Sequence, residues 1–193
     1  EDVHDVQDRW DLGKGAGFYV DADAEPWADH YQMYSYVVSE LPEVVGGNFP
    51  VDTSRQSVMG HSMGGHGALV VGLREPDQYR SISAFAPIVA PTRVQWGRDA
   101  FDAYLNDPAD GAQYDATELV ADHARPDTPI RIDQGTADGF LHDQLRPHLF
   151  TEACQHAGQP LELNLRAGYD HSYYFISTFM PEHVGFHAER LQS

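Results

Sequence analysis

The sequence has few of the features that mark several common classes of protein. Its 193 residues include one cysteine, Cys154, which cannot form a disulfide within the chain and fits a reducing cytoplasm. No apolar run is long enough to cross a bilayer, and no signal peptide is recognisable. The sequence begins with Glu1 rather than Met, so we expect its natural start to be missing or processed. We therefore predict a cytoplasmic protein without membrane segments.

Basic residues are also scarce. The chain has 12 Lys and Arg residues against 30 Asp and Glu residues, a formal net charge of −18, and Lys14 is its only lysine. Nucleic-acid binding needs a basic surface, so this class of partner is excluded, and anionic membranes are disfavoured. Acidic groups that stay hydrated at high ionic strength would suit a salt-adapted protein. A GC-rich genome that favours Arg and Asp codons explains the same composition, and both explanations stay open.

The remaining composition is that of one folded domain. Hydrophobic residues make up 41% of the chain, which is typical of a globular rather than a disordered protein. There is no internal repeat and no low-complexity linker, and the length suits a single domain with a substantial core. We expect residues 1–193 to form that domain.

The order of strand-like and helix-like runs predicts an α/β fold. Strand-like runs occupy residues 55–59, 81–88, 129–134 and 161–165, and helical patterns occupy 29–45, 65–73, 145–157 and 173–191, with shorter pieces at 101–105 and 117–123. The first twenty residues are expected to form a loop. Asp29 is predicted to cap the first helix, Gly46-Gly47 to end it, and Pro181 to interrupt the last helix. This alternation indicates a mostly parallel sheet with helices on both faces.

The most informative segment is Gly60-His61-Ser62-Met63-Gly64, which lies between a strand-like run and a helix of small residues. It resembles the nucleophile elbow of α/β-hydrolases, whose glycines permit a tight turn that holds the serine at the carboxyl end of the sheet. Ser62 is therefore the candidate nucleophile, and the backbone N–H of Met63 is a candidate oxyanion donor. The alternative is a serine that only caps the following helix.

An acid and a histidine follow in the order that such a site needs. His171 comes after the last strand-like run, where the base is expected. Two carboxylates compete to orient it. Asp133 lies within a strand, whereas Asp138 lies in the next loop and is favoured by that position. Asp170 adjoins His171 and cannot easily turn onto its ring.

Two further histidines lie close to the elbow. His61 and His66 are near Ser62 in sequence, but an adjacent side chain points away from the nucleophile. We expect these two histidines to line the pocket or to cap backbone groups.

Rival chemistry has weaker signals. His183 and His187 have a spacing suited to a metal, but Val184 stands where the zinc-peptidase pattern requires Glu. The glycines at positions 13, 15 and 17 lack the preceding strand and the spacing of a dinucleotide loop. Cys154 lies on an amphipathic helix and is expected in the core. We therefore expect neither a metal nor a cofactor.

Six segments together resemble one family along most of the chain. They are residues 15–21, 33–37, 60–69, 83–88, 133–135 and 168–176, the last being Gly168-Tyr169-Asp170-His171-Ser172-Tyr173-Tyr174-Phe175-Ile176. This pattern is similar to the S-formylglutathione hydrolases, also called esterase D. The resemblance implies a cytoplasmic thioesterase that cleaves S-formylglutathione to glutathione and formate in formaldehyde detoxification, with side activity on small carboxylic esters.

The resemblance also implies roles for individual residues. The triad of the family falls on Ser62, Asp138 and His171, and Trp96 matches a tryptophan near the acyl pocket. We expect Trp96 and His61 to contact the substrate, a small-molecule thioester. The family also suggests a homodimer.

One departure from the family affects the expected activity. The chain resembles the family without its first third, which would carry the opening strands and the second oxyanion donor. We therefore expect an α/β-hydrolase domain that is incomplete at its N-terminus, with an exposed sheet edge. Three outcomes stay open: the thioesterase, a general short-chain carboxylesterase, and an impaired or non-catalytic fragment that only binds or dimerises.

Overall fold

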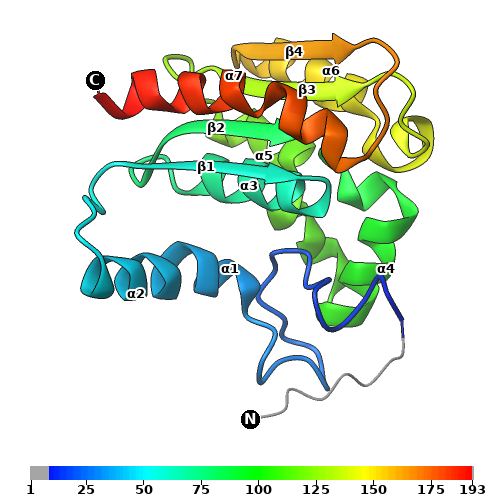
Figure 1. Cartoon of the computed structure of the whole chain (residues 1–193). Helices are drawn as coiled ribbons and strands as arrows, with labels where there is room; N and C mark the ends of the chain where they lie inside the picture. Colours follow the sequence, from blue (N-terminus) through cyan, green and yellow to red (C-terminus); the bar gives the residue numbers. More distant parts are fainter. Residues whose placement is uncertain (1–8, 193) are drawn as a thin grey trace.

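The computed structural model describes residues 9–192, and its centre is a four-stranded sheet. The strands are β1 (Gln56–His61), β2 (Tyr79–Phe85), β3 (Ile130–Gly135) and β4 (Leu161–Arg166). They lie in the order β1-β2-β3-β4, and each neighbouring pair is parallel (Figure 1). The predicted α/β class and the four predicted strands are confirmed. The second strand ends at Phe85, three residues before the predicted end, because the chain turns there to support the elbow.

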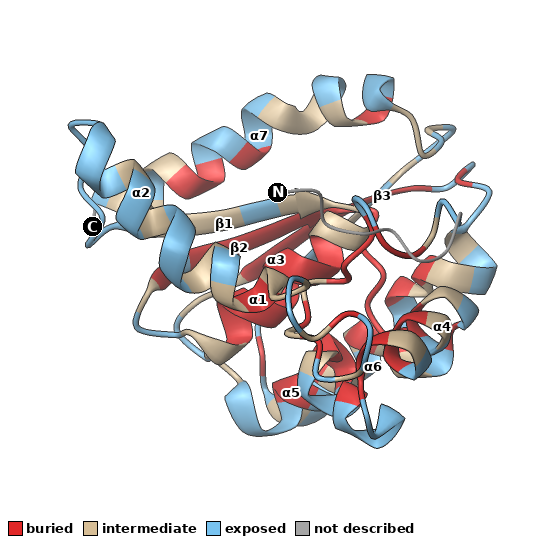
Figure 2. Cartoon of the chain, turned by 90° about the horizontal axis from the view of Figure 1, so that it is seen from below, coloured by how far each residue is buried: buried red, intermediate tan, exposed pale blue. Residues whose placement is uncertain are grey.

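One face of the sheet carries the main apolar core. Helices α3 (Met63–Arg74), α5 (Ala116–His123) and α6 (Pro147–Ala157) pack on this face. Alternate residues of the two central strands face them, so Ile82 and Ile132 are almost fully buried among side chains of these helices. Cys154 belongs to this core, as predicted. In Figure 2 the two central strands and α3 are largely red, whereas β1 is only partly buried.

The other face of the sheet is polar and is covered by α7 (Tyr173–Gln192). Ser81 and Ser83 of β2, with Arg131 and Asp133 of β3, meet this helix. The predicted interruption at Pro181 is wrong, since α7 continues through it. The ion pair of Arg131 with Glu182, one residue after the proline, fixes the helix to the sheet, and such tertiary contacts override the local preference of proline.

The first helical segment begins later than predicted. It comprises α1 (Met33–Ser35), a π-helical turn (Tyr36–Glu40) and α2 (Leu41–Asn48) without a break. Asp29 lies in turns before it and is not its N-cap, and Gly46 and Gly47 lie inside the last turn. Asp21 takes the capping role instead, because its Oδ1 accepts the N–H of Ser35 at 2.9 Å. The wide π-helical turn ends at Glu40, two residues before Pro42, whose ring would clash with a regular preceding turn.

A second core lies beyond the carboxyl ends of the strands. It is surrounded by helix α4 (Gln95–Tyr104) and by three short helical turns (Pro91–Arg93, Pro108–Tyr114 and Leu141–Leu145). The loop that contains Gly13, Gly15 and Gly17, called the glycine-containing loop below, also borders it. Phe85, Phe101, Leu145 and Phe175 are buried there. The loop predicted for the first twenty residues is described from Arg9 onward, and residues 1–8 lie outside the described part.

The edge of the sheet at β1 has no partner strand among the described residues. Met59 of this strand is 38% exposed, and Phe49 and Val51, in the segment that leads into β1, are 60% and 51% exposed. The predicted exposed edge is therefore observed in this part of the structure. No helix within residues 9–192 has the length and apolar character needed to cross a membrane.

Candidate active site

Ser62 occupies a strained turn between β1 and α3. Its backbone has φ 58° and ψ −118°, a region that residues other than glycine rarely adopt. The N–H of Ser62 donates to the carbonyl of Phe85 at 2.9 Å, and its carbonyl accepts the N–H of His66 at 2.9 Å. The side chain makes no capping hydrogen bond, so the alternative of a serine that only caps the helix is wrong. Strain held in this way is typical of a nucleophile elbow.

Only one of the two elbow glycines meets a strict steric limit. A Cβ at Gly60 would lie 1.9 Å from the carbonyl oxygen of Gly64, so no other residue fits there. A Cβ at Gly64 would meet only the hydroxyl of Tyr19 at 3.4 Å, a tight but not forbidden contact. The tight turn thus depends on Gly60, and the equal role predicted for Gly64 is wrong.

Met63 is the first residue of α3. The first N–H groups of a helix have no partner within the helix, and the helix dipole makes this end favourable for negative charge. The backbone N–H of Met63 is thus of the type that holds an oxyanion next to the nucleophile.

The loops after β3 and β4 bring an acid and a base together. Nδ1 of His171 lies 2.6 Å from Oδ2 of Asp138, and Oδ1 of Asp138 accepts the N–H of Phe140 at 2.9 Å. Burial alone would raise the pKa of Asp138, but hydrogen bonds from His171 and from the Phe140 N–H lower it on balance. Asp138 is therefore held as a carboxylate that orients one ring nitrogen of His171.

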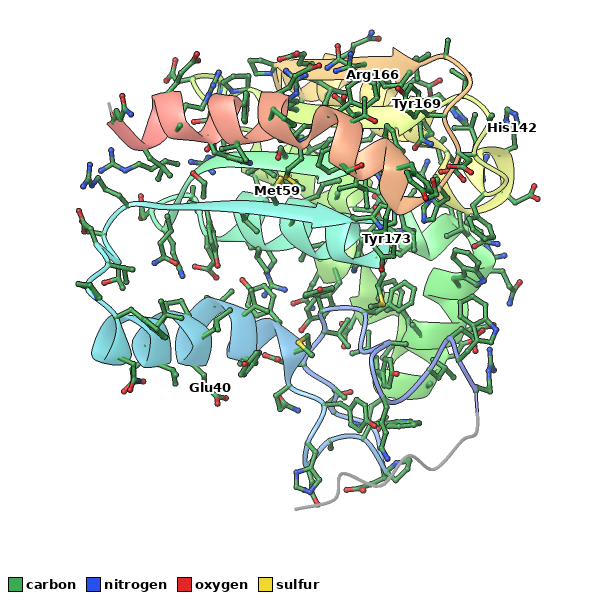
Figure 3. All side chains as sticks on the ribbon, viewed as in Figure 1. Glu40, Met59, His142, Arg166, Tyr169 and Tyr173 are labelled. Carbon is green, nitrogen blue, oxygen red and sulfur yellow. The ribbon has the colours of Figure 1, made fainter. Side chains whose placement is uncertain are left out.

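Backbone contacts fix these two loops against each other. The N–H of Ala137 donates to the carbonyl oxygen of Tyr169 at 2.9 Å, and the N–H of Thr136 donates to the carbonyl oxygen of Arg166 at 3.0 Å. A Cβ at Gly135 would lie 2.3 Å from the Tyr169 carbonyl oxygen, so glycine permits this close approach. Figure 3 shows Arg166 and Tyr169 together at the carboxyl end of β4. The geometry between acid and base is thus set by main chain.

Asp133, the rival acid, belongs to a different network. It lies on the α7 side of β3, where its carboxylate accepts from Arg166 at 2.6 Å and from Asn164 at 3.0 Å. Its Oδ1 is also 3.5 Å from Nε2 of His183. Asp133 makes no contact with His171 in the part of the chain that the structure describes.

His61 lies beside the candidate base. Its ring centroid is 4.5 Å from that of His171 and 6.3 Å from that of Tyr173. Burial, and then the charge of His171, lower the pKa of His61 to about 4, so it is neutral at pH 7. His66 instead bonds through Nε2 to the carbonyl oxygen of Phe18 at 2.8 Å, as predicted for a residue that caps a backbone group.

Among residues 9–192 no hydrogen bond joins Ser62 Oγ to His171. Contacts of this kind often tighten only when substrate binds. The two residues nevertheless share one region, since His61, directly before Ser62, packs on the His171 ring.

A group of aromatic side chains, called the aromatic wall below, also borders the base. Phe140 contacts His171 edge-on with ring centroids 5.2 Å apart, and Trp96 packs against Phe140 at 4.9 Å. Trp10 then packs on Trp96 at 5.6 Å. The family resemblance predicted Trp96 near the acyl pocket, whereas Phe140 and Trp10 were not predicted. The position of Phe140, two residues after Asp138, was a usable signal, whereas nothing local indicates that Trp10 contacts helix α4.

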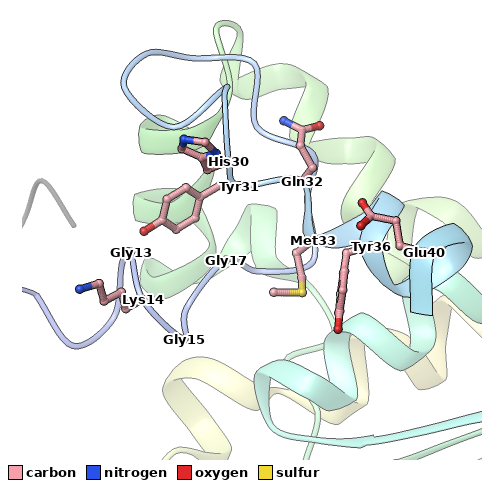
Figure 4. A pocket seen from close by; sticks show the side chains of 10 residues that line it. All are labelled: Gly13, Lys14, Gly15, Gly17, His30, Tyr31, Gln32, Met33, Tyr36 and Glu40. Carbon is pink, nitrogen blue, oxygen red and sulfur yellow. The ribbon is translucent and has the colours of Figure 1, made fainter. Parts of the chain in front are cut away.

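Two hollows border the first helical segment. A groove of about 770 Å³ runs along the free edge of β1 and is lined by Gly60, His61, Gly64 and Tyr173, among others. A separate pocket of about 460 Å³ lies between the glycine-containing loop and the first helical segment, with Lys14, Tyr31 and Glu40 among its lining residues (Figure 4). None of the predicted catalytic residues lines this second pocket.

The rival metal pair takes part in a buried hydrogen-bond network. His187 bonds to Ser81 through Nδ1 and to Ser83 through Nε2, both at 2.7 Å, and Nδ1 of His183 bonds to Ser83 at 2.8 Å. The two imidazoles therefore contact β2 and support α7. No group of three or more potential metal ligands occurs in the described ranges.

Comparisons with known proteins show the family of this chain. Residues 1–186 match the family described as putative esterase. The S-formylglutathione hydrolase of Bos taurus is 51% identical over 97% of this chain and 67% of its own length. That of Paracoccus denitrificans is 49% identical over 95% of this chain and 66% of its length. This chain belongs to the S-formylglutathione hydrolase family. It spans about two thirds of the length of these family members.

Solved structures of other proteins superpose on this chain. An S-formylglutathione hydrolase from Agrobacterium tumefaciens superposes with a TM-score of 0.90 at 55% identity, over 94% of this chain and 66% of that structure. A ferulic acid esterase superposes with a TM-score of 0.67 at 18% identity, which shows a shared fold alone. This chain therefore has the α/β-hydrolase fold of its family.

Proposed function

We propose that this chain is a serine thioesterase that hydrolyses S-formylglutathione, with Ser62, His171 and Asp138 as its catalytic residues. The main support is the 2.6 Å bond between His171 and Asp138, beside an elbow that holds Ser62 at a positive φ. The proposed substrate is that of the S-formylglutathione hydrolases named above, which are about 50% identical to this chain. The reaction is hydrolysis of a formyl thioester to formate and glutathione, which serves formaldehyde catabolism.

Acylation begins with proton transfer from Ser62 Oγ to Nε2 of His171. The serine oxygen attacks the thioester carbonyl, and the Met63 N–H stabilises the resulting oxyanion. Asp138 stabilises the imidazolium through Nδ1. The C–S bond then breaks, and glutathione leaves either as the thiol, with the proton of His171, or as the thiolate, in which case His171 releases its proton to solvent before deacylation. A thiol of ordinary pKa about 8.5 needs little protonation to leave.

Deacylation repeats the same steps with water. His171 accepts a proton from water, which attacks the formyl ester of Ser62, and the same oxyanion donor is used. Collapse of this intermediate breaks the C–O bond to the serine, and the His171 proton returns to Ser62 Oγ. Formate leaves, and the site is ready for another substrate molecule.

The aromatic wall suits a small acyl group. Trp96 and Phe140 pack together 4.9 Å apart and leave Phe140 against the base. We propose that Trp96 limits the room for the acyl chain and that His61 lines the opposite side. The net charge of −18 also supports a small-molecule substrate rather than nucleic acid.

We place the protein in the cytoplasm. Burial raises the pKa of the Cys154 thiol to about 12, and an inert, unpaired cysteine fits a reducing compartment. We also propose a homodimer. The exposed apolar side chains next to β1, Phe49 and Val51, offer one surface for it.

The deciding experiment is hydrolysis of S-formylglutathione by this chain with Ser62→Ala as the matched variant. We expect turnover that the variant loses by several orders of magnitude. Equal turnover by the variant would contradict the assignment of Ser62. A higher kcat/KM for short-chain carboxylic esters than for the thioester would favour a general carboxylesterase, and a folded chain that neither turns over substrate nor reacts with a serine-directed phosphonate would be non-catalytic.

A further inference from the structure

The amide of Gln134 lies where the pattern of its strand calls for an apolar residue. Alternate residues of β3 face the main core, and the two before it on that face are Ile130 and Ile132. Gln134 is next in this series and is fully buried. Its Oε1 is buried without a hydrogen-bond partner in the described part of the chain. An unsatisfied buried acceptor is unfavourable, so stability alone does not account for a glutamine here.

The other end of this amide reaches the catalytic acid. Nε2 of Gln134 donates to Oδ2 of Asp138 at 3.2 Å and to the carbonyl oxygen of Gly135 at 3.1 Å. Oδ2 is the same oxygen that lies 2.6 Å from Nδ1 of His171. The reverse assignment of the amide would turn its oxygen toward a carboxylate, which is repulsive, so the donor orientation is the one that fits.

We propose that Gln134 is a positioning residue that fixes the Asp138 carboxylate for its bond to His171. Two donors then hold this carboxylate from opposite ends, because the Phe140 N–H binds Oδ1 while Gln134 binds Oδ2. With both oxygens held, the carboxylate keeps its plane toward the imidazole through the catalytic cycle. Gln134 itself touches no reacting atom.

This arrangement also affects the charge that His171 experiences. A hydrogen bond to Oδ2 draws negative charge away from the His171 side of the carboxylate. The titratable groups that face His171 are Asp138, His61 from β1 and Asp170 from its own loop. Removing the Gln134 donor changes the environment of Asp138 and leaves the interactions of His61 and Asp170 with His171 unchanged. The fall of kcat on the acidic side of the pH–rate profile, called the acid limb below, should therefore move to higher pH.

Gln159 provides a matched control, because it is another buried glutamine with only backbone partners. Its Nε2 donates to the carbonyls of Thr128 and Pro160, and its Oε1 accepts the N–H of Arg125. A Gln→Met change at either position keeps a similar side-chain volume and removes the amide. Gln159→Met should lower the melting temperature and leave the catalytic parameters alone.

The inference rests on the proposed function for its kinetic test, so the test has two readouts. One is the pH profile of S-formylglutathione hydrolysis by wild type, Gln134→Met, Gln134→Glu and Gln159→Met. The other is the proton NMR signal of the His171 Nδ1–H, which needs no substrate. We expect Gln134→Met to lower kcat about ten- to a hundredfold, with little change in KM, and to shift the acid limb upward.

The variant Gln134→Glu keeps the shape of the side chain and covers the case in which Gln134→Met does not fold. Its second carboxylate next to Asp138 should move the acid limb upward further. Both variants should displace the His171 Nδ1–H signal, while Gln159→Met should not. Unchanged kcat, acid limb and NMR signal in the folded Gln134 variants would overturn the inference. A displaced signal in a chain that does not hydrolyse the thioester would support it while the proposed function fails.

Discussion

The imidazole of His61 packs against that of His171 with ring centroids 4.5 Å apart and planes inclined by 41°. Phe140 also contacts His171, edge-on with ring centroids 5.2 Å apart. Two rings thus pack against the candidate base while Asp138 binds its Nδ1. Because the pKa of His61 is lowered to about 4, its ring is neutral and adds no positive charge next to the imidazolium.

Two replacements of His61 should show whether the activity depends on the packing of its ring or on its polar atoms. We expect His61→Ala to lower kcat by roughly tenfold, because the His171 ring gains freedom to rotate, which corresponds to about 1.4 kcal/mol. His61→Phe keeps a ring of similar position and should retain most of the activity. Steady-state kinetics on the two variants provides the check. An alanine variant more active than the phenylalanine variant would contradict a packing role.

The two rival acids give a second, matched prediction. Asp138→Asn should lower kcat by about 10⁴, since the orienting carboxylate fixes the tautomer of the base. Asp133→Asn should leave kcat within a few fold, but it weakens the buried ion pair with Arg166 and should cost about 3–5 kcal/mol of stability. Kinetics and urea denaturation of both variants test this. A large loss of kcat in folded Asp133→Asn would reverse the assignment.

Acyl selectivity should depend on Trp96. Trp96→Ala enlarges the space next to Phe140, so we expect kcat/KM for butyryl esters to rise relative to formyl or acetyl substrates, by about tenfold. Trp10→Ala is the control, because Trp10 is 77% exposed and, among the ring contacts of the described residues, meets the wall at Trp96 alone. An equal change of selectivity in both variants would mean that Trp96 does not itself bound the acyl site.

The sequence allowed most of the sheet and part of the site to be predicted. The four strands are apolar runs with turn residues between them, and the elbow has a local pattern that needs Gly60. The start of the first helix was not predictable in this way. Its cap is Asp21, twelve residues before Met33, and the capping contact forms only after the chain has folded back.

The same distinction applies to the site. Asp133 lies within β3 and binds Arg166, whereas Asp138 lies in the loop after β3 and binds His171. The sequence distinguishes the two carboxylates only through the position at which the strand ends. The contact between Trp10 and Trp96 and the bond from Gln134 to Asp138 depend on how loops pack. The continuity of α7 through Pro181 likewise depends on ion pairs with β3, which no local pattern contains.

Acid should destabilise the protein before its carboxylates titrate. Burial lowers the pKa of His187 and of His66 to about 4, from an ordinary value of 6.5. The unfolded chain therefore binds protons first as the pH falls. The stability is fully present above pH 6.5 and is lost progressively toward pH 4, by up to about 1.4 kcal/mol per unit for each histidine.

Urea denaturation between pH 7.5 and about pH 5 measures this loss, and it stays above the sequence pI of about 4.7. His187→Gln removes one titrating group but keeps a side chain that can bond to Ser81. We expect a shallower fall of the free energy of unfolding in the variant, by about 1–2 kcal/mol at pH 5. Parallel curves for the two proteins would show that His187 is not the group responsible.

Salt should stabilise the chain if repulsion within its net charge of −18 destabilises the folded state. Like charges repel more strongly in the compact state, and the screening length falls to about 3 Å at 1 M salt. We expect the melting temperature to rise by about 2–8 °C between low and molar NaCl. The double variant Glu40→Gln with Glu43→Gln removes two exposed charges from the first helical segment and should show a smaller rise. A melting temperature that falls with salt would exclude salt adaptation and leave codon usage as the explanation of the acidic composition.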